Sequence, residues 1–258
     1  MTQDVRGGAD PEWFRRYYGD DYAASVRDSL DADRTDRETD FLISLTGVAR
    51  GAHVVDLGCG EGRHALALAG RGMRVTAVDL NRRFLERGRR DALRQDLDVQ
   101  WLHGDMRTPR AGPFDLALLL FHSFGFFSDA ENAQLLRDWG RELEPAGGFV
   151  IDVWNRERIL RDFVPRAERT VGDLAVLEER DWDGATGRLQ VRYRYHWHGK
   201  PARSYEASFR LYGKGELEVL LEEAGFGPSV AYGSLTGDSW RADAPRLVLF
   251  ARRARDTG

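Results

Sequence analysis

The sequence contains very little cysteine and lysine, and it has no long apolar run. Cys59 is its single cysteine, which excludes an internal disulfide and is typical of a reducing compartment. Lysine occurs only at Lys200 and Lys214, and no long basic run interrupts the mixed charge pattern, so we expect no nucleic-acid partner. The longest apolar run, Leu116 to Phe121, is too short to cross a bilayer, so we expect no membrane partner.

The composition indicates one globular domain with an insertion. Of the 258 residues, 42% are hydrophobic and 31% are charged, and the formal charge is −4. The first ten residues, MTQDVRGGAD, are polar, and no apolar stretch follows them, unlike a secretory signal peptide. We therefore expect a cytoplasmic protein in which residues 1–10 are disordered.

Short apolar runs alternate with helical patterns between residues 50 and 158. Helical patterns of this length between strands predict right-handed βαβ units. Strands that are apolar on both faces predict a parallel sheet with helices on each side, so the sequence predicts an α/β fold. The expected strands are His53–Leu57, Arg74–Asp79, Val99–His103, Phe114–Phe121 and Gly148–Val153.

The pattern changes after residue 158. Three runs, Val171–Arg180, Leu189–Trp197 and Ser204–Leu211, alternate with period two and predict an antiparallel β insertion at 159–212 with one wet face. A helical pattern at 215–224 and two closing strands, Val230–Tyr232 and Arg246–Ala251, return the chain to the core. We therefore expect a core made of 50–158 and 213–253, and an N-terminal helical cap at 11–49.

A glycine-rich turn, DLGCGEG, follows the first expected strand. Gly58 and Gly60 lack a Cβ, so the backbone can turn tightly and approach a ligand. Asp79 ends the next strand, from which a carboxylate can reach the hydroxyls of an adenosine ribose. The alternative for Asp79 is the N-cap of the following helix. The pattern favours an adenosine cofactor.

The charge of the turn distinguishes between adenosine cofactors. A dinucleotide motif would have its third glycine at position 63, which is Arg63. Asp56 leads into the turn, where a carboxylate repels a pyrophosphate and attracts a sulfonium and an α-ammonium group. The sequence therefore predicts S-adenosyl-L-methionine as cofactor, with S-adenosyl-L-homocysteine as product.

Five segments in this order resemble the motifs of class I methyltransferases, which have a Rossmann-like fold with an antiparallel closing hairpin. The segments are Val54–Gly62, Asp79-Leu80, Gly104-Asp105-Met106, Leu143–Gly148 and Leu221–Phe226. The resemblance implies the following cofactor-binding residues: Tyr22, Asp56, Gly58, Gly60, Asp79, Leu80, Asp105, Met106 and Phe121. It implies that Leu80 and Met106 sandwich the adenine and that Asp105 accepts a hydrogen bond from its amine; the alternative for Met106 is core filling.

Several other stretches resemble a narrower bacterial subgroup that is similar to amino-sugar N-methyltransferases of antibiotic pathways. They are WFRRYYGDDY, FHSFGFF, DVWNRER and SFRLYGKGELEVLLEEAGF. In that subgroup an N-terminal helix and a strand-rich insertion cover the acceptor. The resemblance implies methyl transfer to a small-molecule acceptor, through N, O or C, in secondary metabolism.

Candidate catalytic residues follow the fourth and fifth strands, because reacting centres of such sheets lie beyond the carboxyl ends of the strands. His122 can act as a general base, although a passive pocket wall is the alternative. Trp154 can stack on the acceptor or bind a cation. Tyr18 can close over the methionine end together with Tyr22, and ordinary helix packing is the alternative for both.

The sequence leaves several alternatives to methyl transfer onto a small molecule. Methyltransferases of DNA or protein nitrogens typically share an Asn-Pro-Pro-Tyr-like sequence where this chain has FHSFGFF, and RNA or protein substrates stay as alternatives. Two further alternatives are a nicotinamide-dependent oxidoreductase and a cofactor-binding module without activity. His196 and His198 lie on one strand face but lack a third ligand, so we expect no metal. The sequence does not determine the oligomeric state, and a homodimer is among the options.

Overall fold

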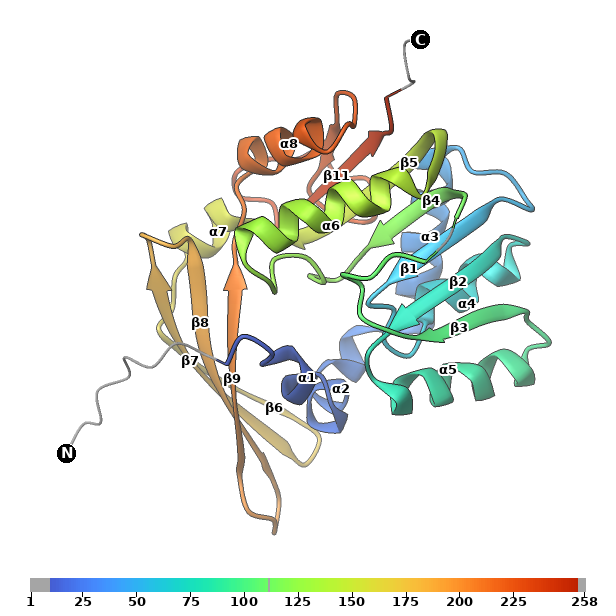
Figure 1. Ribbon diagram of the computed structural model, residues 1–258. Helices are drawn as coiled ribbons and strands as arrows, with labels where there is room; N and C mark the ends of the chain where they lie inside the picture. The colour runs from blue at the N-terminus through green and yellow to red at the C-terminus, as the bar shows by residue number, and fades with distance from the viewer. Residues whose placement is uncertain (1–9, 111, 255–258) are drawn as a thin grey trace. The chain divides into compact units, whose positions relative to one another are not determined.

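The computed structural model describes residues 10–110 and 112–254 (Figure 1). These residues belong to two compact units. The smaller unit comprises residues up to 29 together with 164–210, and the larger comprises 30–163 and the residues from 211 onward. Nine of the ten residues predicted as a disordered tail lie outside the described residues.

The larger unit is built on one sheet with the order β10-β11-β5-β4-β1-β2-β3. Its strands are β1 His53–Leu57, β2 Arg74–Asp79, β3 Val99–His103, β4 Phe114–Leu119, β5 Leu143–Trp154, β10 Val230–Tyr232 and β11 Arg246–Arg252. The strands β1 to β5 run parallel to their neighbours, whereas β11 is antiparallel to both β5 and β10. The predicted α/β class, with a mostly parallel sheet and an antiparallel closing hairpin, is confirmed.

Helices pack on this sheet in two groups. The helices are α3 Ala32–Thr46, α4 Arg63–Gly70, α5 Arg82–Arg94, α6 Asp129–Arg141, α7 Arg156–Arg161 and α8 Lys214–Glu223. The helix α4 contacts both α3 and α5, and α6 contacts α8 (Figure 1). Strand residues between the layers, such as Val54, Leu116 and Val150, are fully buried, as expected for a sheet covered on both faces. No described helix has both the length and the apolarity needed to span a membrane.

Two strand ends in the larger unit differ from the prediction. The strand β4 ends at Leu119, because Phe121 and His122 adopt left-handed backbone conformations with φ of 54° and 66° and leave the ladder. The strand β5 begins at Leu143 and not at Gly148, and a register shift in its pairing with β4 accommodates the LEPAGG turn. The apolar pattern reveals strands but not such local departures.

The smaller unit combines short helices with an antiparallel sheet of order β6-β7-β8-β9. Its elements are α1 Phe14–Tyr17, α2 Asp20–Val26, the 3₁₀ helix η1 Arg27–Ser29, β6 Arg166–Val171, β7 Leu174–Asp183, β8 Arg188–Trp197 and β9 Arg203–Arg210. The prediction of a single strand at 171–180 was wrong, since the chain turns at Gly172, whose φ is 55°, and forms a hairpin there. The predicted antiparallel character is confirmed.

One face of this smaller sheet is buried, as the alternation in β8 predicted. Leu189, Val191, Tyr193 and Tyr195 are buried. Within the same unit, the ring of Tyr17 lies 4.7 Å from that of Tyr193. The aromatic N-terminal segment therefore forms the core of this unit together with the buried face of the sheet.

Candidate active site

The glycine-rich turn after β1 has backbone angles that other residues rarely adopt. Gly58, Gly60 and Gly62 have φ values of 68°, 60° and 81°. The amide of Gly58 donates a hydrogen bond to the carbonyl of Val78 in β2, at 2.8 Å. A Cβ on Gly62 would lie 2.3 Å from the ring of Trp101, so a side chain cannot replace it without rearrangement. The turn is thus held close against the neighbouring strands.

Asp79, the last residue of β2, links its strand to this turn. Its carboxylate accepts hydrogen bonds from the amide of Gly60, at 2.8 Å, and from the amide of Asn81, at 2.7 Å. Burial raises the pKa of Asp79, although these hydrogen bonds act in the opposite direction. The N-cap of α5 is Asn81, whose side chain accepts from the amide of Arg83, so the alternative N-cap role for Asp79 is wrong.

Asp56 lies inside β1, one residue before its end, and is 3% exposed. Burial raises the pKa of this carboxyl to about 7, even though the nearby Arg63 guanidinium lowers it. No residue in the described part of the chain forms a hydrogen bond or ion pair with it. Burying a carboxylate without a partner is costly, so its presence here needs a functional explanation.

The corner after β3 contains the residues expected around an adenine. Leu80 is half-buried and Met106 is buried, and the carbonyl of Met106 accepts a 2.6 Å hydrogen bond from the indole of Trp139. Asp105 binds the guanidinium of Arg107 through both carboxylate oxygens, at 3.1 and 2.7 Å. No pattern in the sequence indicated this ion pair, and an adenine amine would have to bind Asp105 beside it.

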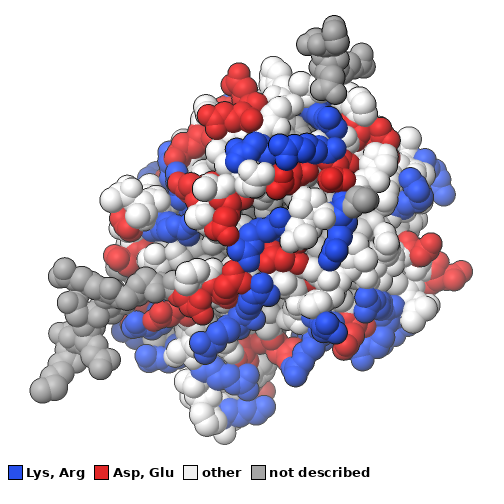
Figure 2. All heavy atoms as spheres, viewed as in Figure 1, with Lys and Arg blue, Asp and Glu red and all other residues white. Residues whose placement is uncertain are grey.

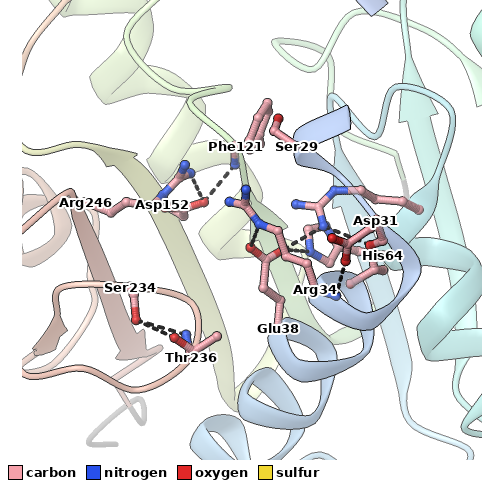
Figure 3. Close-up of polar contacts among 12 residues, drawn as sticks. Ser29, Asp31, Arg34, Glu38, His64, Phe121, Asp152, Ser234, Thr236 and Arg246 are labelled. Atoms are coloured by element: carbon pink, nitrogen blue, oxygen red, sulfur yellow. Dashed lines mark hydrogen bonds and ion pairs between the residues drawn. The ribbon is translucent and has the colours of Figure 1, made fainter. Parts of the chain in front are cut away.

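A buried ion pair organises the loop that leaves β4. Asp152 on β5 is fully buried, and both of its carboxylate oxygens accept hydrogen bonds from Arg246 on β11 (Figure 3). Asp152 also accepts hydrogen bonds from the amide of Phe121, through its side chain, and from the amide of His122, through its carbonyl, both at 2.9 Å. These two hydrogen bonds replace the ones that the amides of Phe121 and His122 would otherwise form in the strand ladder.

The structure brings two candidate catalytic residues together. The ring of His122 lies 4.3 Å from that of Trp154, measured between centroids. The Nε2 atom of His122 lies 3.0 Å from a guanidinium nitrogen of Arg246. Burial and the charges of Arg246 and Arg34 lower the pKa of His122 well below its ordinary value, so the ring is neutral near pH 7.

A second buried cluster, which the sequence analysis missed, supports the glycine-rich turn. Glu38 on α3 contacts Arg34 at 2.8 Å, Arg63 at 2.6 Å and His64 at 3.0 Å, and Arg63 and His64 begin α4 directly after the turn. Figure 3 shows Glu38 between Arg34 and His64. Burial raises the pKa of Glu38, but its hydrogen bond with His64 and the charge of Arg63 together hold it well below its ordinary value. The cluster therefore attaches α3 to the start of α4.

Tyr18 and Tyr22 belong to the smaller unit. Tyr18 follows α1 and Tyr22 lies on α2, with their ring centroids 4.7 Å apart. Their predicted role as a lid over the cofactor stays a prediction.

Part of the larger unit is similar in sequence to a known family. Residues 54–147, from β1 to the first part of β5, match a family described as a methyltransferase domain. An S-adenosylmethionine-dependent methyltransferase from Clostridium acetobutylicum has the same fold, with a TM-score of 0.77 and 14% identity over 90% of this chain and 96% of its own. The larger unit therefore resembles a methyltransferase domain in sequence over residues 54–147, and it shares the fold of solved S-adenosylmethionine-dependent methyltransferases.

Two further proteins to which the chain is similar come from Streptomyces and Micromonospora. The cypemycin N-terminal methyltransferase of a Streptomyces species is 36% identical over 104 residues, which cover 40% of this chain and 42% of that protein. The amino pentose methyltransferase CalS10 from Micromonospora echinaspora has a TM-score of 0.67 and 21% identity, covering 90% and 96% of the two chains. The chain spans only 42% to 62% of the first curated relatives that it matches, and the likenesses to solved structures show the fold alone.

Proposed function

We propose that the protein transfers a methyl group from S-adenosylmethionine to a small-molecule acceptor. The observation that carries this proposal is the buried carboxylate of Asp56, which lies at the glycine-rich turn of a methyltransferase domain and has no protein partner among the described residues. A cofactor with a sulfonium and an ammonium group compensates for such a charge, whereas a pyrophosphate would be repelled.

The residues around the turn fit this cofactor. Gly58 and Gly60 leave the turn without side chains, so a ligand can approach the backbone closely. Asp79, held by the amide of Gly60, would accept hydrogen bonds from ribose hydroxyls. When bound, S-adenosylmethionine supplies an activated methyl group, so the protein must mainly position the acceptor and exclude water.

The adenine and methionine ends would be held by residues on either side of the turn. Leu80 and Met106 would contact the adenine, with Asp105 accepting from its amine. Asp56 would face the methionine end, and Phe121, with its half-buried ring at the exit of β4, would line the same region.

The small-molecule acceptor is supported by the relatives and by the charges at the surface. CalS10 is an amino pentose methyltransferase involved in calicheamicin biosynthesis, and its fold extends over most of this chain. In Figure 2, lysine and arginine side chains are interspersed with acidic ones, whereas a surface that follows a phosphate backbone is typically basic. We therefore propose an acceptor from secondary metabolism, with an amine nitrogen as the methylated atom.

Two measurements test this function. Calorimetry with S-adenosylmethionine, S-adenosylhomocysteine and NAD⁺ should show binding of the first two only. Asp79→Ala should then weaken that binding several-fold, because it removes charge-assisted hydrogen bonds. Methyl-labelled cofactor offered with amino sugars, small phenols, a peptide mixture and tRNA should label a small molecule. Binding of NAD⁺ alone, or label found only in tRNA or peptide, would contradict the proposal.

A further inference from the structure

The contact between Arg246 and His122 determines which nitrogen of the histidine carries a proton. A guanidinium nitrogen of Arg246 lies 3.0 Å from Nε2 of His122. Arginine has only donors, so Nε2 must accept this hydrogen bond with its lone pair. In a neutral imidazole the single proton then resides on Nδ1.

Arg246 is fixed in this orientation by the sheet and by Asp152. In the pairing of β11 with β5, Arg246 lies opposite Trp154. Asp152 is two residues before Trp154, so the three side chains share one face of the sheet. Arg246 is 9% exposed and Asp152 is fully buried, and their two hydrogen bonds leave the guanidinium little freedom to turn away from His122.

The surroundings of His122 also oppose the uptake of a second proton. A proton on Nε2 would point toward the N–H groups of Arg246, and the charge of Arg34 acts on the same ring. The groups that face the ring are the indole of Trp154, the phenyl of Phe121 and these two arginines, none of which accepts a proton. Protonation of His122 near neutral pH is therefore unfavourable.

The other nitrogen, Nδ1, is a donor without a partner. It is buried, and no group in residues 10–110 or 112–254 forms a hydrogen bond with it. Buried polar groups are nearly always hydrogen-bonded in native proteins, so an unused N–H at the carboxyl ends of β4 and β5 calls for an explanation. In open α/β sheets that edge is where ligands bind.

We propose that Asp152 and Arg246 are positioning residues that hold His122 as the neutral Nδ1–H tautomer, and that His122 donates a hydrogen bond to a lone pair of the methyl acceptor. This inference rests on the proposed function and replaces the general-base role that the sequence suggested for His122. The acceptor's attacking atom forms its bond to the methyl carbon, the bond from that carbon to sulfur breaks, and the acceptor's proton passes to water. The acceptor is thus an amine with an oxygen or a second nitrogen near the methylated nitrogen.

The tautomer can be read directly by NMR, without knowledge of the acceptor. Protein labelled with ¹⁵N-histidine is studied by long-range ¹H–¹⁵N correlation between pH 6 and 8, with and without S-adenosylhomocysteine. The His122 signals are assigned by their loss in His122→Asn. We expect a protonated Nδ1 and an unprotonated Nε2 across this range. A protonated Nε2, or a titration near pH 6.5, would overturn the inference, whereas absence of shifts on adding S-adenosylhomocysteine would count against the proposed function alone.

Removing the arginine tests the positioning role. Because Arg246→Met would leave Asp152 buried and unpaired, the variant for comparison is the double substitution Asp152→Leu with Arg246→Met, with folding checked by circular dichroism. We expect the Nε2–H tautomer of His122 to be detected in this variant and not in the wild type. An unchanged Nδ1–H tautomer in the folded double variant would show that Arg246 does not set it.

The role of the donor is tested by turnover with an acceptor from the labelling panel. In His122→Asn the side-chain amide can place an N–H close to the position of Nδ1 but cannot take up a proton. We expect His122→Asn to stay within about tenfold of the wild-type kcat, and His122→Ala to fall by a further tenfold or so. Equal losses in both variants, together with a rate that rises with pH through a pKa absent from His122→Asn, would indicate a base and overturn the inference.

Discussion

Two buried aspartates on parallel strands of the same sheet have opposite surroundings. Asp152 on β5 is bound by Arg246 and by the amide of Phe121, so its charge is compensated within the protein. Asp56 on β1 is equally buried, and its pKa is raised to about 7, mainly by burial. The strand β4 lies between them. Asp152 therefore has a structural role, and the uncompensated charge of Asp56 supports our proposal that this carboxylate binds a cationic ligand.

The largest effect is expected when Asp152 loses its charge. Asp152→Ala leaves Arg246 buried and unpaired and removes the acceptor for the Phe121 amide, so the free energy of unfolding should fall by about 3–5 kcal/mol. Urea denaturation followed by circular dichroism measures this. The control is the double substitution Asp152→Leu with Arg246→Met, which should recover much of the loss. A single variant that loses under about 1 kcal/mol would show that the ion pair is not structural.

Substitution of Asp56 should affect binding and not folding. Asp56→Asn keeps the shape and removes the charge, so affinity for S-adenosylmethionine at pH 8 should fall roughly tenfold to hundredfold. The free energy of unfolding of the ligand-free protein should stay the same or increase, because an unpaired buried charge has been removed. Calorimetry and urea denaturation of the same preparation give both values. Unchanged affinity would show that the cationic groups bind elsewhere.

The contrast between Asp56 and Asp152 also explains which parts of the site could be predicted from the sequence. Asp56, the glycines of the turn and Asp79 lie within two strands and one turn, so their chemistry can be read from neighbours along the chain. The parallel strands β1, β2 and β3 were predicted to the residue because each is a short apolar run between helical patterns. The turn at Gly172 was missed because strand-like residues flank it on both sides.

The missed contacts join residues that are distant in sequence. Arg246 contacts Asp152 across 94 positions, and Glu38 contacts His64 across 26. No local pattern marks such residues, because an arginine in a strand or a glutamate in a helix is usually exposed. The positive φ of His122, which sets where its ring lies, is likewise fixed by the bonds to Asp152 and not by its own preference.

The raised pKa of Asp56 predicts two opposite pH effects. In the ligand-free protein Asp56 binds its proton more tightly than in the unfolded chain, so the stability that it contributes decreases as the pH rises from about 4 to 7. Binding of a cationic cofactor favours the ionised form, so affinity should increase a few-fold between pH 6.5 and 7.5.

Other groups also titrate in this range, so the contribution of Asp56 has to be isolated. Burial lowers the pKa of His64 to about 4, so its contribution to stability increases as the pH rises from 4 to 6.5. The difference between wild type and Asp56→Asn cancels the His64 contribution. Stability profiles from urea denaturation and affinities from calorimetry should therefore be compared between these two proteins. Parallel pH profiles in both would refute the assignment to Asp56.

The smallest effect is expected from a carboxylate in the same turn that is exposed. Glu61 lies between Gly60 and Gly62, and its carboxylate binds Arg87 at 2.7 Å with 45% of its side chain exposed. Solvent screens this pair, so Glu61→Gln should change the free energy of unfolding by less than about 1 kcal/mol and leave cofactor affinity within about twofold. Calorimetry beside Asp56→Asn makes the comparison. If Glu61→Gln weakened binding as much as Asp56→Asn, the negative field of the whole turn, and not burial of one carboxylate, would select the cation.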